Sequence, residues 1–255
     1  MAVMEPKRPP YRWLETIGSL DGVVPVRKLH PTPVKNTGRV ATRKATKAQQ
    51  FESLLEQDFL ILLDADDRVE RIGVQPLTIR WVGSDGKQRS YTPDVVVHYS
   101  ERAQERDPTL CTTLFEIKPR ALIKLDWDEW RIKFRAAIAW ARQHNCRFKL
   151  ITEVEIRTPY LENKRTLRHF TLEALGLSDP TAHETSQLIL KSVAGLGHTT
   201  PRALLSAIST GIETRALAIP YLWLLLNEGY IEADLNEKIT MSSPIWPTAR
   251  MKASP

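Results

Sequence analysis

Three charged side chains lie at the ends of two apolar stretches of the sequence. Asp94 directly precedes the valines 95–97, and Glu116 and Lys118 follow Leu114-Phe115, with Glu116 22 positions after Asp94. Alternate residues of a strand share a face, so Glu116 and Lys118 should point the same way. If the two stretches pair as neighbouring strands, all three charges meet. Carboxylates bind hard cations such as Mg²⁺, and a cation beside an ammonium group suits the hydrolysis of a phosphodiester.

A fourth charged residue, Glu56, lies in segment 50–66, whose apolar residues recur at helical spacing. Leu60 and Leu63 follow it on the same side, which places Glu56 at the border of the predicted apolar face. A carboxylate at such a border is unusual unless it has a partner. The Asp…Glu-x-Lys pattern is weak by itself, because charges at strand ends are common. Its position inside apolar strands, where an unpaired charge is costly, favours a nuclease.

The elements that would hold these residues alternate between helices and strands. Strands are predicted at 69–72, 77–82, 91–99, 112–117 and 147–152, helices at 50–66 and 127–144, and a charged loop at 100–108. Both halves of the charged motif therefore lie on strands. Helices mixed with strands in this order predict an α/β fold with a mixed sheet flanked by helices.

The pattern changes to short apolar helices after about residue 170. We predict helices at 185–194, 199–208 and 214–228, and a two-stranded wing from 230–235 and 239–241. Three helices and a wing suggest a winged-helix domain. The chain then divides into an N-terminal arm (1–49), a nuclease domain (50–170) and a winged-helix-like C-terminal domain (171–255).

The net charge of +6 is distributed unevenly. Residues 1–50 carry +7, residues 51–170 carry +1 and residues 171–255 carry −2. Five basic residues of the arm are the expected contacts to DNA phosphates: Lys35, Arg39, Arg43, Lys44 and Lys47. A solvated basic tail is the alternative. The negative balance of the C-terminal domain argues against DNA binding there and, with its apolar third helix, favours docking to a protein.

Several classes of protein are disfavoured. No apolar run reaches the ~18 residues that span a membrane, and the N-terminus lacks the apolar core of a secretion signal, so we expect a cytoplasmic protein. Cys111 and Cys146 are too few for a disulfide framework. The absence of CxxC and HExxH patterns argues against structural zinc.

Taken in order along the chain, these motifs resemble TnsA, the endonuclease subunit of heteromeric bacterial transposases. That family has the PD-(D/E)xK, restriction-endonuclease-like fold. The resemblance covers about residues 35–170 and is carried by six short runs: 53–56 (Ser-Leu-Leu-Glu), 66–69 (Asp-Asp-Arg-Val), 75–77 (Gln-Pro-Leu), 91–94 (Tyr-Thr-Pro-Asp), 115–119 (Phe-Glu-Ile-Lys-Pro) and 151–153 (Ile-Thr-Glu). The tail after residue 170 resembles the TnsA C-terminal winged-helix domain only in its pattern.

The resemblance implies a role for each residue of the motif. Asp94 and Glu116 would be the principal metal ligands, with the backbone carbonyl of Ile117 as a third. Lys118 would orient or activate the attacking water and stabilise the transition state, and Glu56 would complete the site through a second metal or its waters. Mg²⁺ is the expected ion, and Mn²⁺ is expected to substitute. Gln75 would either support the site from nearby or cap a strand.

The resemblance also implies partners. They are double-stranded DNA at transposon ends, a TnsB-type DDE transposase that cuts and joins the 3′ ends, and a TnsC-type AAA+ ATPase. This subunit would nick the 5′ ends. Two alternatives stay open: another nuclease of the same fold that acts alone, and a DNA-bound scaffold whose site is silent.

Six residues of segment 127–144 have two interpretations. The aromatic ones favour core or interface positions over base stacking, and the basic ones lie either near phosphates or on an exposed helix face: Trp127, Trp130 and Trp140, and Arg131, Lys133 and Arg135.

Overall fold

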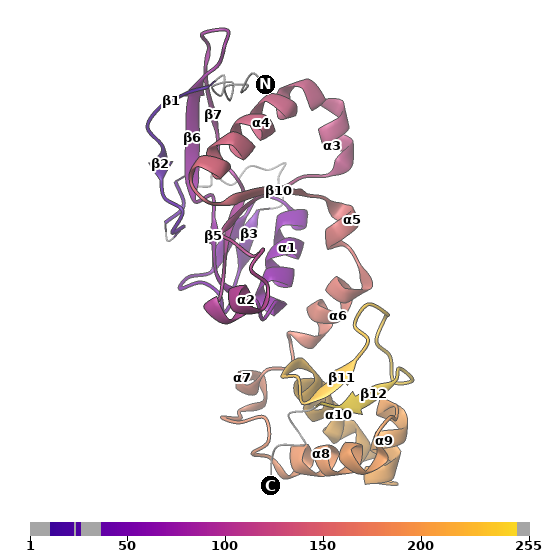
Figure 1. Cartoon of the computed structure of the whole chain (residues 1–255). Helices are drawn as coiled ribbons and strands as arrows, with labels where there is room; N and C mark the ends of the chain where they lie inside the picture. Colours follow the sequence, from indigo (N-terminus) through magenta and orange to yellow (C-terminus); the bar gives the residue numbers. More distant parts are fainter. Residues whose placement is uncertain (1–10, 23, 27–36, 249–255) are drawn as a thin grey trace, which may run out of the picture. The chain divides into compact units, whose positions relative to one another are not determined.

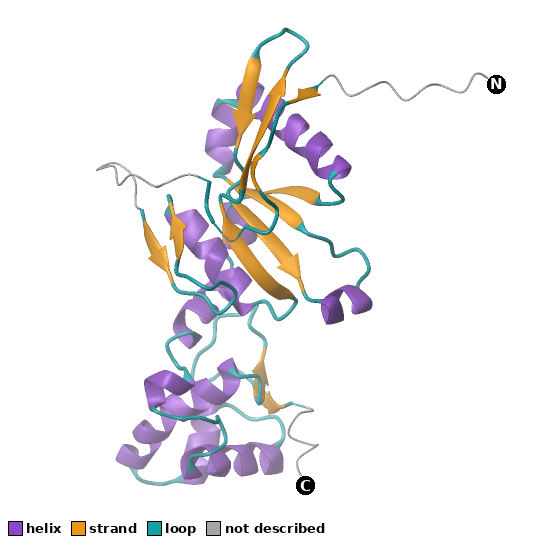
Figure 2. Ribbon diagram, turned by 90° about the vertical axis from the view of Figure 1, so that its left-hand side faces the viewer, coloured by secondary structure: helices purple, strands orange, loops and turns teal. Residues whose placement is uncertain are grey.

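The computed structural model describes residues 11–22, 24–26 and 37–248. The chain divides into two compact units between Ile156 and Arg157. The boundary predicted at residue 170 therefore falls inside the second unit. Figure 2 shows that long strands belong to the first unit, whereas the second is mainly helical.

The first unit is built on a mixed four-stranded sheet with the order β10-β9-β8-β5 (Figure 1). Its strands are β5 (Val69–Val74), β8 (Val95–Tyr99), β9 (Thr113–Ile117) and β10 (Arg147–Ile151). β9 pairs in parallel with β10 and antiparallel with β8, and β8 pairs antiparallel with β5. The predicted mixed sheet, and the predicted pairing of the two motif strands, are confirmed.

A second four-stranded sheet is centred on β6 (Leu77–Val82). β6 pairs antiparallel with β7 (Gln88–Tyr91), with β1 (Arg12–Trp13) and with β2 (Ile17–Gly18). The small hairpin β3 (Gly38–Val40) and β4 (Gln49–Phe51) stands apart from it. Short stretches of the predicted N-terminal arm therefore form strands of the first unit.

Five helices accompany the sheets of the first unit: α1 (Leu54–Ala65), α2 (Glu101–Arg106), α3 (Arg120–Leu125), α4 (Trp127–Gln143) and α5 (Glu153–Ile156). Successive residues of β9 point to opposite faces of its sheet. Leu114 faces the cluster below α4, whereas the ring of Phe115 meets Phe59 of α1 at 5.0 Å. The sheet is therefore covered by helices on both faces.

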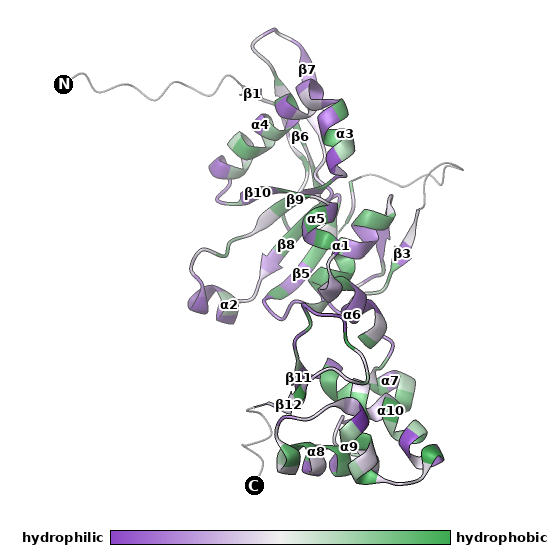
Figure 3. Cartoon of the chain, turned by 90° about the vertical axis from the view of Figure 1, so that its right-hand side faces the viewer, coloured by the Kyte–Doolittle hydropathy of each residue, from purple (hydrophilic) through white to green (hydrophobic). Residues whose placement is uncertain are grey.

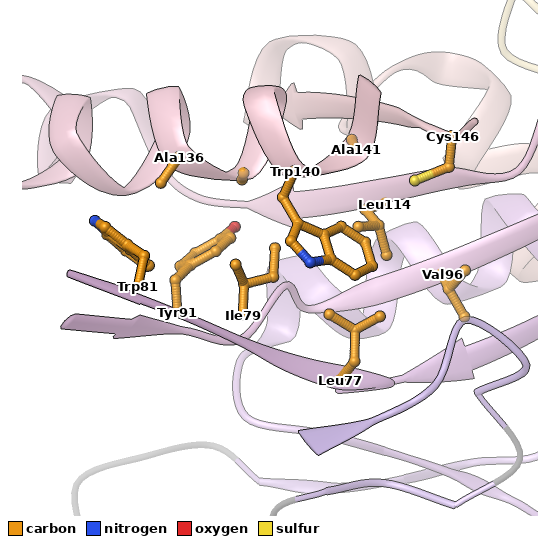
Figure 4. Packing of buried hydrophobic residues seen from close by; sticks show 11 residues of the cluster. Leu77, Ile79, Trp81, Tyr91, Val96, Leu114, Ala136, Trp140, Ala141 and Cys146 are labelled. Carbon is orange, nitrogen blue, oxygen red and sulfur yellow. The ribbon is translucent and has the colours of Figure 1, made fainter. Parts of the chain in front are cut away.

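Figure 4 shows the core between α4 and the strands beneath it. Small residues of the helix, Ala136 and Ala141, allow Trp140 to reach down onto Leu77 and Leu114. All five are almost completely buried. Burial of large apolar side chains is the main favourable term in folding, so this cluster fixes α4 against the strands that carry the charged motif.

The second unit packs helices around an apolar centre. Its elements are α6 (Pro159–Leu167), α7 (Leu172–Leu175), α8 (Glu184–Leu196), α9 (Pro201–Ile208), α10 (Ile212–Asn227), β11 (Ile231–Ala233) and β12 (Ile245–Pro247). Apolar residues dominate α8, α9 and α10 in Figure 3. β11 and β12 form an antiparallel pair. The three predicted helices correspond to α8, α9 and α10, and a two-stranded sheet is present beside them; the winged-helix assignment stays a prediction.

Three elements differ from the sequence prediction in the first unit. The strand predicted at 91–99 is broken at Thr92-Pro93-Asp94, because proline has no N–H for a sheet. The charged loop 100–108 contains α2, which the Ser100 hydroxyl caps by accepting from the N–H of Ala103. The helix predicted from residue 50 begins only at Leu54, since Gln49–Phe51 pairs as β4.

In the second unit, the second strand of the sheet is β12 and not the predicted 239–241. The side chain of Asn163 accepts the N–H of Ile239, and Thr240 turns back onto Ser243. These hydrogen bonds replace strand pairing at 239–241. In the part of the chain that the structure describes, no helix combines the length and apolarity needed to cross a membrane.

Candidate active site

The register of β8 and β9 brings the two motif carboxylates together. Val95 lies opposite Phe115, so Asp94, which precedes Val95, and Glu116, which follows Phe115, lie at the same end of the strand pair. The N–H of Asp94 donates to the carbonyl of Phe115 at 2.9 Å. Both side chains line one cavity, so the carboxylates of Asp94 and Glu116 lie close together at this end of the pair.

Glu116 is a buried carboxylate with two partners. Its side chain is 3% exposed. One oxygen lies 2.9 Å from the Nζ atom of Lys118, and the other accepts a hydrogen bond from the Tyr91 hydroxyl at 2.7 Å. The sequence prediction that Glu116 and Lys118 leave one face agrees with this ion pair. A buried negative charge is tolerated when it is paired in this way.

Asp94 lies in a strongly acidic environment. Its Oδ2 atom accepts the N–H of Ile117 at 2.7 Å. Burial raises the pKa of Asp94 well above its usual range, and the nearby charges of Glu116 and Glu56 raise it further. The fold therefore holds Asp94 where its negative charge is unfavourable, which is a common property of functional sites.

Glu56 stands in the first turn of α1, where the sequence placed it beside the acidic pair. Ser53 caps this helix by accepting the N–H of Glu56, while the Glu56 carboxylate accepts the Ser53 hydroxyl at 2.9 Å and the N–H of Glu52 at 2.8 Å. Burial raises the pKa of Glu56, and the charges of Glu52 and Glu116 add to the effect. Glu56 thus belongs to the same electrostatic cluster.

A cavity of about 440 Å³ opens beside these residues. Glu56, Asp94, Glu116, Ile117 and Lys118, the five residues proposed from the sequence for catalysis and metal binding, all line it. The prediction of site residues therefore corresponds to one location in the first unit.

The same cavity is lined by residues that sequence reasoning did not assign to the site. They are Glu52, Tyr91, Trp130 and Lys133, which lie close to the predicted residues only in the folded chain. Tyr91 stands three residues before Asp94, and Glu52 one helical turn before Glu56. That spacing is the one signal that could have indicated two of them.

Gln75 is a nearby support of the site. Its backbone N–H donates to the carbonyl of Asp94 at 2.7 Å, and its side-chain amide donates to Glu52. Its φ of 44° lies in the left-handed region that favours glycine. A non-glycine residue held there is a form of strain that clusters at functional sites.

The donor set fits a hard divalent cation in chemistry but is not gathered into a complete cage. Carboxylate and carbonyl oxygens are the ligands that Mg²⁺ prefers. Among the described residues, no three His, Cys, Asp or Glu side chains form a group that could hold a metal ion. Burial raises the pKa of Asp94, and the charges of Glu116 and Glu56 raise it further; a positive ion bound here would relieve this repulsion.

The basic residues proposed for DNA binding are in different situations. Lys35 lies outside the described residues. Arg39, Arg43 and Lys47 are exposed, but the Nζ atom of Lys44 donates to the carbonyl of Val69 at 2.6 Å. Within the described part of the chain, Lys44 would have to break this hydrogen bond to contact a phosphate, whereas Arg39, Arg43 and Lys47 would break none of their side chains' own.

The tryptophans of α4 differ in burial and position. Trp140 is buried in the core, as expected, whereas Trp127 is 49% exposed and Trp130 lines the cavity. Among the basic residues, Lys133 also lines the cavity, while Arg131 forms an ion pair with Asp128 on the helix surface.

The fold and the site define a class of protein. A mixed sheet carries an acidic pair and a lysine at the ends of two neighbouring strands, and helices cover both faces. This arrangement is consistent with a nuclease of the restriction-endonuclease-like class.

Residues 66–153 match the family model of the TnsA-like endonuclease N terminal domain. This segment is therefore similar to a TnsA-like endonuclease domain, and the resemblance stated from the sequence is confirmed over these residues. The matched segment contains Asp94, Glu116, Ile117 and Lys118 and begins ten residues after Glu56. No curated protein matches the chain in sequence.

Proposed function

We propose that this protein is a metal-dependent DNA endonuclease that cuts the 5′ ends of a transposon. The observation that carries the proposal is the meeting of Asp94, Glu116 and Lys118 at one cavity, within a segment that matches a TnsA-like endonuclease.

In the proposed reaction, a water molecule attacks the scissile phosphorus in line, the bond to the 3′ oxygen breaks, and that oxygen takes up a proton. The products are a 5′-phosphate and a 3′-hydroxyl. Asp94 and Glu116, with the carbonyl of Ile117, would hold Mg²⁺ or Mn²⁺, and Glu56 would complete the acidic set. When bound, the cation supplies Lewis-acid polarisation of the phosphate and lowers the pKa of a bound water.

The side chains of the chain have separable tasks in this proposal. Lys118 carries positive charge to the place where negative charge develops on the phosphate. Glu116 orients Lys118 through their ion pair. Tyr91 orients Glu116 through its hydroxyl and leaves the second carboxylate oxygen for Lys118. Each group is thereby fixed before substrate arrives.

The partners proposed for the reaction are double-stranded DNA at transposon ends, a TnsB-type DDE transposase and a TnsC-type AAA+ ATPase. The exposed basic side chains of Arg39, Arg43 and Lys47 support contact with DNA phosphates. The apolar C-terminal unit, which we propose to be a winged helix, supports docking to protein. Exposed Leu217 and Ile212 of α10 offer apolar surface for it.

The proposal is tested by a cleavage assay on a transposon-end duplex with Mg²⁺ or Mn²⁺, with and without a TnsB-type transposase. Asp94→Ala and Lys118→Ala should abolish 5′-end cutting and leave 3′ joining measurable. Asp67→Ala, which removes an exposed carboxylate away from the cavity, is the matched control and should cut normally. Full excision by either site variant would refute the site.

The same assay separates the alternatives. Cutting without any partner would indicate a nuclease that acts alone. If DNA is bound but no condition gives cutting, the protein is a scaffold with a silent site.

A further inference from the structure

The ammonium group of Lys118 has a second contact besides Glu116. Its Nζ atom lies 3.4 Å from the centre of the Trp130 ring and 2.9 Å from the carboxylate of Glu116. Trp130 belongs to α4, whereas Lys118 directly follows β9. The side chain of Lys118 is only 18% exposed, so the ammonium is held between a ring face and a carboxylate, with little solvent.

Trp130 is itself held in place by a line of aromatic rings. It stacks on Phe134 with ring centres 5.6 Å apart, and Phe134 contacts Phe148 of β10 at 5.7 Å. Phe148 meets the ring of Tyr91 edge to face at 6.1 Å. The hydroxyl of Tyr91 donates to Glu116. The line of rings therefore runs from Tyr91, one partner of Glu116, to Trp130, whose ring face contacts the other partner, Lys118.

We propose that Trp130 is a positioning residue for Lys118 in phosphodiester cleavage, an inference that rests on the proposed function. A lysine ammonium is a mobile point charge on a flexible stem. The ring face attracts this charge without competing for the carboxylate oxygens of Glu116. Trp130 thus fixes the direction of Lys118 while Glu116 remains able to bind other groups.

A neighbouring lysine shows that the contact is specific to the site. The Nζ atom of Lys133 also approaches the Trp130 ring, at 4.5 Å, but Lys133 forms an ion pair with Glu129 on its own helix. Its position is fixed from α4 alone. Of the two lysines at this ring, only Lys118 comes from another element, the end of β9, and only Lys118 forms an ion pair with Glu116.

The first test is a measurement of single-turnover cutting at saturating DNA. Trp130→Leu should lower the rate about tenfold, which is within the range of a desolvated cation–π contact, and should leave DNA affinity unchanged. Trp130→Phe keeps a ring and should recover most of the rate. Trp127→Leu is the control, because Trp127 lies on the same helix, is half exposed and does not line the cavity.

The second test needs neither metal nor DNA. The midpoint of thermal unfolding is measured for Trp130→Leu, Lys118→Met and the double variant of the full chain. If the two side chains interact, the double variant should lose less than the sum of the two single losses. Trp130→Met, which also lacks a ring face, replaces the leucine variant if that one does not fold.

The outcomes distinguish the inference from the function on which it rests. Unchanged cutting by Trp130→Leu, or additive losses in unfolding midpoint, would overturn the positioning role. Weaker DNA binding with an unchanged rate at saturation would also overturn it, since it would identify Trp130 as a base-stacking residue. Normal cutting by Lys118→Met with non-additive midpoints would instead remove the proposed function and leave the contact intact.

Discussion

The two units of the chain bury polar side chains in opposite ways. In the second unit, buried Asn163 donates to the carbonyls of Leu235 and Glu237 and accepts the N–H of Ile239. In the first unit, Asp94 lies against the like charges of Glu116 and Glu56. One buried group has complementary partners, whereas the other has neighbours that repel it.

This difference indicates which buried polar groups of the chain can still bind a ligand. A polar group whose hydrogen bonds are complete stabilises the fold and has nothing left to offer. Buried carboxyls whose pKa is raised, as for Asp94 and Glu56, are unfavourable for folding and are retained when function needs them. This contrast supports our proposal that the acidic cavity is the functional centre, whereas the hydrogen bonds of Asn163 stabilise the fold.

The strongest test of this difference between the two units is to remove the charge of Asp94. Asn keeps an oxygen that can accept the N–H of Ile117 but ends the repulsion with Glu116 and Glu56. We expect Asp94→Asn to raise the thermal unfolding midpoint in the absence of metal. It should also lower 5′-end cutting by at least about a thousandfold, since several kcal/mol of transition-state stabilisation depend on the cation.

Two further measurements complete this prediction. Added Mg²⁺ should raise the unfolding midpoint of the unaltered protein more than that of Asp94→Asn, because ligands that bind only the folded state stabilise it. A variant that unfolds earlier than the unaltered protein without metal would contradict the proposed repulsion.

The converse change removes the complementary partners in the second unit. Asn163→Ala leaves two carbonyls and one N–H without their partner and should destabilise this unit by about 2–3 kcal/mol. Urea denaturation, monitored by fluorescence or circular dichroism, should then show the second unit unfolding at a lower urea concentration. DNA cleavage should stay unchanged if it needs only the first unit. Equal destabilisation of both units would contradict the prediction that they unfold separately.

A smaller effect is expected from Tyr91→Phe, which deletes one hydroxyl and keeps the ring. The hydrogen bond to the Glu116 carboxylate has a length of 2.7 Å, and hydrogen bonds to charged groups contribute about 1.5–3 kcal/mol. We expect the cutting rate at saturating DNA to fall about tenfold or more. A rate equal to that of the unaltered protein would show that Tyr91 does not orient Glu116.

The smallest effect concerns a buried group that has no role in the proposed chemistry. Burial raises the pKa of the Cys146 thiol to about 11. The thiolate is thus disfavoured in the folded state, and any stability linked to the neutral thiol is lost as pH rises from about 8.5 towards that value. In a Cys111→Ser background, alkylation at pH 8 should be slow until urea unfolds the chain. Fast alkylation of the folded protein would contradict this burial.

Particular residues show how far the sequence could predict the site. Apolar strands with charged ends were enough to predict that the strands at 91–99 and 112–117 pair, and the spacing of Glu116 and Lys118 was enough to place them on one face. Glu56 was indicated by its place at the border of an apolar helix face. In each case the signal is local, because it depends on the period of a single element.

Other features could not be predicted because they depend on residues distant in sequence. Tyr91 and Trp130 have the pattern of ordinary core aromatics, and only the packing of β7 and α4 gives them polar partners. The prediction of a strand at 239–241 was wrong because Asn163, 76 positions away, captures the N–H of Ile239. The strand propensity of residues 239–241 depends on these residues alone, so it cannot predict a hydrogen bond to a residue so distant in sequence.

The amino-acid sequence by itself determined most of the elements and the charged groups available: which strands end in charge, which helix carries Glu56, and which segment, 66–153, resembles a TnsA-like endonuclease. Only the tertiary structure decided how these charges are paired, shielded and set against one another. The physical reason is that periodicity is a property of neighbouring residues, whereas the pKa of a carboxyl and the direction of an ammonium group depend on every atom that surrounds them.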